Sequence, residues 1–583
     1  MQRRDDVPRT RAWVMLGAMA AAGLALRLWS LGFGLPAVYN MDEVAILNRA
    51  LTFAKGDPNP HNFLYPTLYF YALFAWEGLY FVVGRAAGWF ASLGAFQNAF
   101  IVDPTGHYLA ARGLGALCGT LTIVAVYLFG ARLHGRRVGL AAALFLALAP
   151  VAVRDAHYVK LDVPVTLFAT LAFAALAAIP ADADAATRSR RWILAGAIAG
   201  LAISTHYYAA YLAVPFVAAA IADGSRHGRW GTSVTLLMLA GVATLGAFAL
   251  TSPFFAFEPS AVVRDLTELR EVDIDRAVTH GLFSSLPAYT GLLARAVGAP
   301  VFVLGIGGAL LALADDWRRS LPAVSFLAAF LAFVSNTYPA SRYLNIMLPP
   351  LAVLAAYTAW RLARFASGRA SIAMVAVCGL AALPALMDSV RWDRFFGQDD
   401  TRTLARRFIE REVPPGSTVL VQPYSAPIEQ SREGLIEALR LHLGDESRAS
   451  TKFQLRLAAT PYPAPAYRIL YVGESGKGDA PPGDVDKIYL SPRAFGPSRG
   501  LEPLRAAGVQ YVVMTRYGPT PEALAPLEFT LRHRARPLAT FSPYRPGVQA
   551  AAASVPPFRH NGNTWIDAQL QRPGPIVEIW KVE

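Results

Sequence analysis

The sequence predicts a polytopic α-helical membrane protein with a soluble α/β domain at its C-terminal end. Of its 583 residues, 54% are hydrophobic and only 16% are charged, and the mean hydropathy is +0.34. Apolar stretches close to the ~20 residues needed to cross a bilayer recur through the first two thirds. Soluble proteins carry about 25% charge. The composition therefore excludes a soluble multidomain protein and a disordered chain.

We expect about eleven transmembrane helices in a core that covers residues 1–390. Their predicted ranges are 12–31, 108–131, 137–153, 163–180, 192–205, 207–222, 231–251, 298–314, 321–335, 343–361 and 370–388. The apolar segment 65–90 is rich in aromatic residues but contains Glu77 and Arg85. It fits either a further span or juxtamembrane helices that lie at the interface.

Basic residues in short loops decide between these two interpretations. If 65–100 is interfacial and the N-terminus is inside, every basic cluster falls on the inner side, as the positive-inside rule requires. These clusters are Arg132/Arg136/Arg137, Arg188/Arg190/Arg191, Arg226/Arg229, Arg318/Arg319 and Arg361/Arg364/Arg369. The net charge of +13 is thus a signal of membrane topology, and we expect no nucleic-acid partner. The outer loops are then 32–107, 154–162, 252–297 and 336–342.

Beyond residue 388 the chain becomes polar and rich in Pro and Gly. Short β-type runs appear among helix-like segments. They are TVLVQ (418–422), YRILYV (467–472), KIYL (487–490), VQYVVM (509–514) and VEIWKV (577–582). We therefore expect residues 391–583 to form an α/β domain. Under the predicted topology this domain lies outside the cytoplasmic (plasma) membrane, to which we assign the protein.

Two acidic clusters lie at membrane mouths on the predicted outer side. The first is Asp42-Glu43, shortly after the first span, and the second is the turn RDAHYVKLD (154–162), which contains His157, Lys160 and Asp162. Ionisable groups this close to hydrocarbon are costly, so they indicate a functional site. Solvated loop carboxylates are the alternative interpretation, and two such clusters on one side make it the weaker one.

A carboxylate at this position can act as general base for a hydroxyl group. If the substrate is a lipid-linked phosphate, cationic donors must also stabilise the charge that develops on the leaving group. The outer-face candidates are Lys55, His61, Lys160, His206 and Arg342. For His206 the alternative is an ordinary interfacial residue, and for Arg342 it is a side chain that snorkels from a span end.

The order of these motifs resembles that of the GT-C glycosyltransferases. An acidic pair follows the first span, a Pro-aromatic segment (YPTLYFY, 65–71) comes next, and a second Asp follows the third span. Further matching segments are AARGLGA (110–116), HGRR (134–137) and SRY (341–343) before Pro349-Pro350. Within GT-C the pattern is similar to the protein O-mannosyltransferase and lipid A aminoarabinose transferase group (glycosyltransferase family 39). The similarity covers roughly residues 12–390.

The resemblance implies an inverting sugar transfer from a polyprenyl-phosphate-linked donor. It implies that Asp42 is the catalytic base with Glu43 beside it, that Asp162 orients the acceptor or the sugar, and that Arg342 lies near the lipid phosphate. Relatives typically have His-Pro-Pro or Lys-Pro where this chain has Tyr65-Pro66-Thr67. A phosphate contact from His61 or Lys55 is the expected substitute at that position.

The expected partners are the lipid-linked donor, membrane lipids, and a protein, lipid or polysaccharide acceptor. No cofactor or metal site is predicted, although the acidic pair leaves a divalent cation open. Two other classes remain open. A transporter or lipid-linked sugar flippase would fit the number of spans, but transporters place charge near the midplane of the bilayer. A scaffold with a degenerate transferase core would fit the departure at Tyr65.

Overall fold

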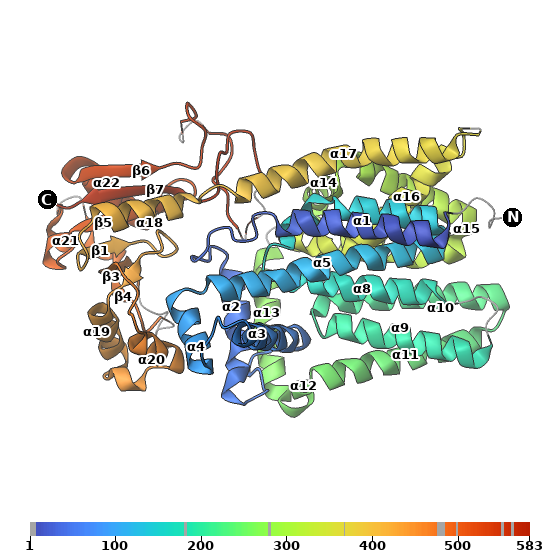
Figure 1. Ribbon diagram of the computed structural model, residues 1–583, viewed down its shortest axis with the longest axis horizontal. Coiled ribbons are helices and arrows are strands. Elements are labelled where there is room, and N and C mark those ends of the chain that lie inside the picture. Colours follow the sequence, from blue (N-terminus) through green and yellow to red (C-terminus); the bar gives the residue numbers. More distant parts are fainter. Residues whose placement is uncertain are drawn as a thin grey trace. The chain divides into compact units, whose positions relative to one another are not determined.

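A computed structural model describes residues 7–179, 184–277, 281–366, 368–474, 484–496, 499–549, 553–560, 562 and 565–583 (Figure 1). The chain divides into two compact units. Unit 1 comprises Met1–Leu31, Asp42–Gly78 and Leu109–Asp393, and unit 2 comprises Gly32–Met41, Leu79–Tyr108 and Arg394–Glu583. Two segments between the first span and residue 108 thus belong to the same unit as the C-terminal part of the chain.

Unit 1 is helical. Its helices are α1 (Arg9–Leu28), α2 (Met41–Leu51), the first part of α3 (Leu68–Ala86), α5 (Thr105–His134), α6 (Arg136–Ala147), α7 (Pro150–Asp155), α8 (Asp162–Ala177), α9 (Ala185–Ile203), α10 (Ala213–His227), α11 (Trp230–Thr251), α12 (Phe254–Phe257), α13 (Pro259–Ala277), α14 (Leu286–Val297), α15 (Ala299–Val334), α16 (Leu348–Ala363) and α17 (Ala370–Phe396). Short 3-10 helices cover Thr52–Lys55, Tyr207–Leu212 and Ser341–Met347.

Seven helical segments of the described residues are long and apolar enough to cross a membrane. They are Arg9–Leu28, Thr105–His134, Tyr207–His227, Trp230–Thr251, Ala299–Val334, Ser341–Ala363 and Ala370–Glu412. Helix α15 combines the two predicted spans 298–314 and 321–335, and Asp316 interrupts it with non-helical angles of φ −156° and ψ 85°. The predicted class, a polytopic helical membrane protein, is confirmed, while the number of about eleven spans stays a prediction.

The segment 68–86, for which the sequence left two interpretations open, forms the single helix α3. It is not among the seven long apolar segments of the described chain. Figure 1 shows α3 end-on, whereas α5 and α8 run across the same view. The part of α3 in unit 1, Leu68–Gly78, therefore crosses the direction of the bundle, as expected of an interfacial helix.

Small residues let helices of the bundle approach closely. A Cβ atom at Gly196 would clash with the carbonyl oxygen of Ala240, and one at Gly308 would clash with that of Leu354. Thr244 adds a hydrogen bond from its hydroxyl to the Gly196 carbonyl at 2.9 Å. Backbone contact of this kind is how helices pack where lipid removes the hydrophobic driving force.

The described residues of unit 2 form a seven-stranded sheet of order β2-β3-β1-β5-β7-β6, with β4 paired to β3. Its strands are β1 (Thr418–Val421), β2 (Glu429–Gln430), β3 (Ala466–Val472), β4 (Ile488–Leu490), β5 (Tyr511–Arg516), β6 (Arg536–Phe541) and β7 (Ile576–Lys581). Strand β1 is parallel to β3 and β5, and β7 is antiparallel to β5. All five predicted β-type runs form strands.

Helices cover both faces of this sheet. The helices of the unit are α4 (Leu93–Val102), α18 (Thr401–Glu412), α19 (Arg432–Leu443), α20 (Thr451–Ala458), α21 (Glu502–Ala506) and α22 (Ala525–Arg534), with the second part of α3. On one face Leu420 and Val512 pack with Leu504 and Leu527. Val419 and its neighbours on the other face pack with residues of α18. The result is a three-layer arrangement, and it agrees with the α/β class predicted for the C-terminal region.

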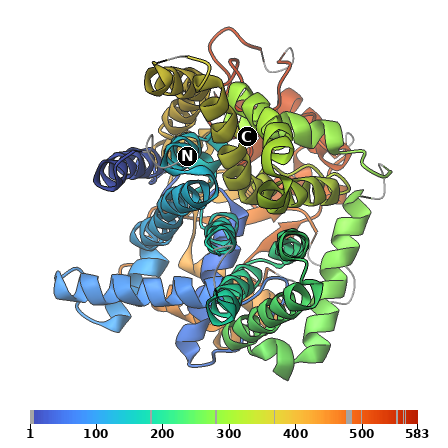
Figure 2. The same ribbon diagram turned by 90° about the vertical axis from the view of Figure 1, so that its right-hand side faces the viewer.

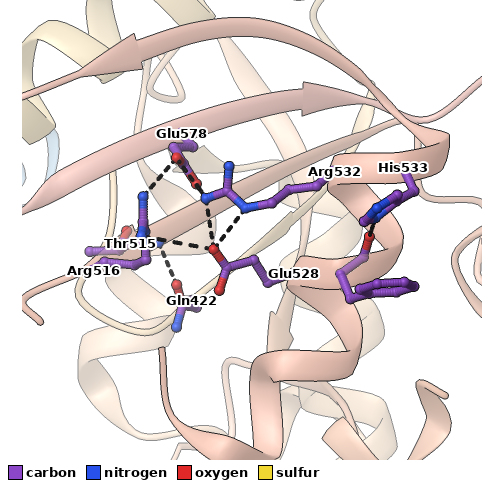
Figure 3. Close-up of polar contacts among 8 residues, drawn as sticks. Gln422, Thr515, Arg516, Glu528, Arg532, His533 and Glu578 are labelled. Atoms are coloured by element: carbon purple, nitrogen blue, oxygen red, sulfur yellow. Dashed lines mark hydrogen bonds and ion pairs between the residues drawn. The ribbon is translucent and has the colours of Figure 1, made fainter. Parts of the chain in front are cut away.

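An ion-pair network lies beside the C-terminal end of β5 (Figure 3). Arg516 Nη2 lies 2.8 Å from Glu578 Oε1, and Arg532 Nη2 lies 2.7 Å from Glu528 Oε1. Gln422, which follows β1, accepts a hydrogen bond from the backbone of Thr515. Open α/β sheets bind ligands at the carboxyl ends of such strands. Here each carboxylate of the network already has an arginine partner from the same unit.

Candidate active site

The centre of the candidate site in unit 1 is the carboxylate of Asp42. This residue lies in the first turn of α2, and its Oδ2 atom is 3.2 Å from Lys160 Nζ and 3.2 Å from Arg342 Nη1. Lys160 comes from the turn between α7 and α8, and Arg342 from the 3-10 helix Ser341–Met347. Three segments far apart in sequence thus place one carboxylate between two cations.

These two cations keep Asp42 ionised. Burial raises the pKa of the Asp42 carboxyl, but the charges of Lys160 and Arg342 lower it by more, so the pKa lies below its ordinary value. The side chain of Asp42 remains 38% exposed, whereas that of Lys160 is only 8% exposed. The carboxylate is therefore reachable from solvent, while the lysine that holds it is fixed in the protein.

Glu43, the second member of the acidic pair, is turned into the protein. Its carboxylate accepts two hydrogen bonds from Arg112, at 2.9 Å from Nε and 3.0 Å from Nη2. Both side chains are completely buried. Glu43 Oε1 also accepts from the backbone of Val159 at 3.1 Å, and Arg112 donates to the Leu31 carbonyl at 2.8 Å. This bidentate pair joins α2 to α5 and to the turn that carries Lys160.

A second network fixes the 3-10 helix that carries Arg342. Arg154 donates to Asp155 Oδ1 at 2.7 Å and to Ser341 Oγ at 2.9 Å. Asn345 Nδ2 donates to Asp155 Oδ2 at 2.6 Å and to the backbone carbonyl of Arg342 at 3.0 Å. All of these side chains except that of Arg342 are buried. The network sets the position of the Arg342 backbone relative to the α7–α8 turn.

Asp162 lies among polar aromatic residues, of which Tyr208 is buried and Tyr65 and His206 are half-buried. Its Oδ1 atom accepts a hydrogen bond from the Tyr208 hydroxyl at 3.2 Å. The His206 ring lies against Tyr208, with centroids 3.9 Å apart, and meets Tyr65 edge-on at 5.4 Å. Burial raises the pKa of Tyr65 to about 12, and Arg342, Asp162 and Asp42 all act on its phenol electrostatically. The residue that departs from the family pattern therefore lies at the candidate site as a neutral hydrogen-bonding group.

His206 is neutral at physiological pH. Burial and the charge of Arg342 lower the pKa of its imidazole to about 3. Its Nδ1 atom accepts a hydrogen bond from the backbone of Tyr208 at 3.4 Å. An imidazole in this state offers a dipole to a substrate and no positive charge.

The other predicted substrate-binding residues make different contacts. His157 is buried, and its ring nitrogens lie 2.9 Å from the Val153 carbonyl and 2.8 Å from the Trp29 carbonyl. His61 lies 2.7 Å from Asp57 on the surface, and Lys55 is exposed at the end of its 3-10 helix. The described residues contain no group of three or more His, Cys, Asp or Glu side chains that could hold a metal ion.

Sequence reasoning did not identify Arg112, Asn345 or Tyr208 as parts of the site. Arg112 lies within the matching segment 110–116, and its charge inside an apolar run is a signal that it needs a buried partner. Asn345 and Tyr208 carry no charge, and only the fold brings them to Asp155 and Asp162. No spacing in the sequence indicates those two contacts.

Geometry and fold together define a class: a polytopic membrane protein with an acidic site between loops at the ends of its helices. Residues 103–256 match the family model described as Dolichyl-phosphate-mannose-protein mannosyltransferase. This match covers about a quarter of the chain, and it agrees with the resemblance to the GT-C glycosyltransferases that the motifs indicated. No curated protein sequence matches the chain significantly.

Several solved structures resemble the fold at a distance. ArnT from Cupriavidus metallidurans bound to undecaprenyl phosphate is 15% identical, with 98% of each chain covered and a TM-score of 0.47. The Archaeoglobus fulgidus oligosaccharyltransferase tethered with an acceptor peptide is 12% identical, with 87% of this chain and 69% of that chain covered and a TM-score of 0.46. The S. cerevisiae Pmt1-Pmt2 complex bound to the sugar donor is 20% identical, with 43% and 34% covered and a TM-score of 0.34.

Proposed function

We propose that this protein transfers a sugar from a polyprenyl-phosphate-linked donor to a hydroxyl acceptor at the outer face of the plasma membrane, with inversion and with Asp42 as general base. The observation that carries the proposal is the contact of one Asp42 oxygen with Lys160 and Arg342, each at 3.2 Å. The reaction needs both a base and phosphate-binding cations, because the proton and the leaving-group charge appear at different atoms.

Donor binding would rearrange this group. A phosphate binds arginine and lysine through charge-assisted hydrogen bonds. The donor phosphate would therefore compete with Asp42 for Lys160 and Arg342, and it would leave the carboxylate free to accept a proton. Asp42 is thus free to act as the base only when the donor is bound. In the resting protein it stays paired with the two cations.

The chemical step then follows from these positions. The acceptor oxygen attacks the anomeric carbon, its proton passes to Asp42, and the bond from that carbon to the phosphate oxygen breaks with its electron pair on the phosphate. The transition state has oxocarbenium character, as in glycoside hydrolysis. Lys160 and Arg342 stabilise the developing charge, and each preorganised donor contributes about 3 kcal/mol.

Two buried acids would support the reaction without exchanging protons. Glu43 is locked by Arg112 and holds α2, and therefore Asp42, against the Lys160 turn. Asp162 with Tyr208 and Tyr65 forms a polar wall that would orient the sugar or acceptor through hydroxyl groups. The identity of the sugar and of the acceptor would then depend on this wall and on the remaining outer loops.

Purified membranes that contain the protein would be supplied with a panel of radiolabelled polyprenyl-phosphate sugars. We expect covalent transfer of label from one donor to a non-donor product in the parent protein. Asp42→Asn should lose most of this transfer. Its matched control is Asp103→Asn, because Asp103 accepts a hydrogen bond from the backbone of Thr105 at the start of α5, at 3.0 Å, and an Asn side chain can accept it equally well. Movement of label across proteoliposomes without any covalent transfer would contradict the proposal and favour a transporter or flippase.

A further inference from the structure

A second polar site lies at the other end of the helices that carry the candidate active site. A cavity of about 550 Å³ is lined by the side chains of Arg132, Arg191, Arg226, Arg318 and Arg319. Its volume is in the range of small-molecule binding sites. Figure 2 looks onto this end of the bundle, where α5 and α10 end. No step of the proposed transfer reaction uses these residues.

Along α5, the two sites are separated by about the thickness of the hydrocarbon core. Arg112 contacts Glu43 below the candidate active site, and Arg132 lines the cavity. The 20 residues between them rise about 30 Å along an α-helix, which is the thickness of the hydrocarbon core. All five arginines come from clusters that the positive-inside rule places in the cytoplasm. The cavity therefore opens at the level of the inner-leaflet headgroups.

Among the residues that the structure describes, little negative charge compensates the positive charge of the cavity. Asp223 also lines it, but this carboxylate is already paired with Arg188 and with His227. Within the described residues, Arg191, Arg226 and Arg319 form no side-chain hydrogen bond or ion pair. Arg132 and Arg191 moreover repel each other electrostatically. An anion in the cavity would relieve this repulsion.

The rest of the lining fits an amphiphile. Leu176, Ile179 and Pro322 line the cavity with partly exposed side chains, and they contribute apolar surface. Phe129, Phe173 and Trp192 also line it but are buried. A free anion would contact the arginines but would leave the apolar surface uncovered.

We propose that this cavity binds the phosphate headgroup of an anionic lipid from the cytoplasmic leaflet, with Arg191, Arg226 and Arg319 as its main ligands. Arg132 and Arg318 are held by hydrogen bonds to the Ala174 carbonyl at 2.8 Å and to Ser225 Oγ at 2.9 Å. They shape the cavity and add charge. This lipid site is separate from the proposed donor site. Each of the two can therefore be removed by substitution while the other is measured.

The test uses the full-length protein in detergent, with dioctanoyl phosphatidic acid, dioctanoyl phosphatidylcholine and inorganic phosphate as probes. Binding is followed by thermal melting and by native mass spectrometry. The double variant Arg191→Gln/Arg226→Gln is compared with Arg190→Gln/Arg229→Gln. The control pair removes the same charge from the same loops. All four arginines are exposed, and only Arg191 and Arg226 line the cavity.

We expect phosphatidic acid to raise the Tm of the parent and of the control pair. The cavity variant should bind phosphatidic acid with a Kd at least about tenfold higher, because the charge-assisted hydrogen bonds of two arginines are lost. Phosphatidylcholine and inorganic phosphate should give much smaller shifts. Equal binding of phosphatidic acid by both double variants would overturn the assignment of the site to the cavity. A Tm shift with inorganic phosphate equal to that with phosphatidic acid would overturn the assignment of a lipid as its ligand. If the double variant does not yield folded protein, the single variant Arg319→Gln is compared with the control pair in the same binding measurement.

Discussion

Arg342 donates a hydrogen bond from Nη1 to Asp42 Oδ2 at 3.2 Å, across 300 residues of sequence. The contact joins the first helix after the initial span to the 3-10 helix before α16. Lys160 meets the same oxygen at 3.2 Å. Because one Asp42 oxygen contacts both cations, an anion that binds them more tightly can displace the carboxylate. This relationship is the basis of the proposed competition between Asp42 and a donor phosphate.

Lys160→Gln should change both the rate and its pH dependence. Loss of one charged donor to the leaving group is expected to lower kcat by about 10²–10³. Lys160 lowers the pKa of Asp42 against the effect of burial, so its removal raises that pKa. Asp42 is then protonated at a higher pH, so the acidic limb of the kcat/KM profile shifts to higher pH. The measurement is a pH–rate profile on purified protein.

Lys452→Gln serves as control for this profile, because Lys452 is exposed on α20 in unit 2. It should leave both the rate and the acidic limb unchanged. An acidic limb in Lys160→Gln that coincides with that of the parent would show that Lys160 does not act on the catalytic base.

Glu43→Gln should affect stability more than chemistry. Removal of one partner from a buried ion pair costs about 3–5 kcal/mol, because Arg112 keeps its charge without compensation. We expect a marked fall in the Tm of Glu43→Gln and little change in Asp42→Asn, whose carboxylate is partly exposed. If Glu43→Gln melts with the parent and loses activity, the glutamate takes part in the reaction directly.

Asn345→Leu should weaken donor binding although Asn345 is a positioning residue. The substitution removes the donor to Asp155 and leaves a buried carboxylate oxygen without it, at a cost of about 1–3 kcal/mol. The 3-10 helix would shift with Arg342, so KM for the donor should rise more than kcat falls. A selective loss of kcat with unchanged KM would contradict a role through Arg342.

His206→Asn should preserve most of the activity and the shape of the pH profile between pH 5 and 8. The pKa of His206 is lowered to about 3, so the imidazole is neutral throughout this range and Asn replaces one neutral polar group with another. The measurement is the pH–rate profile of the variant. If the profile of the parent contains an ionisation near pH 6 that His206→Asn removes, the histidine titrates in the working range.

Much of the fold follows from the sequence because its signals are local. Apolar length predicted membrane helices, and β-branched runs predicted β1, β3, β4, β5 and β7. The strand β6 was missed, since it begins Arg536-Pro537 at the edge of the sheet, where a proline and a bulge are tolerated. The short β2 has only two residues, Glu429 and Gln430, and offers no pattern.

The candidate site was partly predictable for a similar reason. Asp42, Lys160, Asp162 and Arg342 are charged groups next to hydrocarbon, so their cost alone marks them. Their pairing is a product of tertiary structure, and no spacing indicates that Asp42 faces both Lys160 and Arg342. Glu43 was predicted to lie beside the base Asp42 among the catalytic residues. Burial against Arg112 separates the two, and that difference depends on how α2 is packed.

The most direct test of the central claim is single-turnover sugar transfer by Asp42→Asn, with donor binding measured on the same preparation. The general base accounts for a factor of about 10²–10⁴ in rate. We predict a loss of this size with donor affinity equal to or tighter than that of the parent, because a neutral amide no longer competes for Lys160 and Arg342. Transfer at the rate of the parent, or a loss explained entirely by weaker donor binding, would contradict Asp42 as the base.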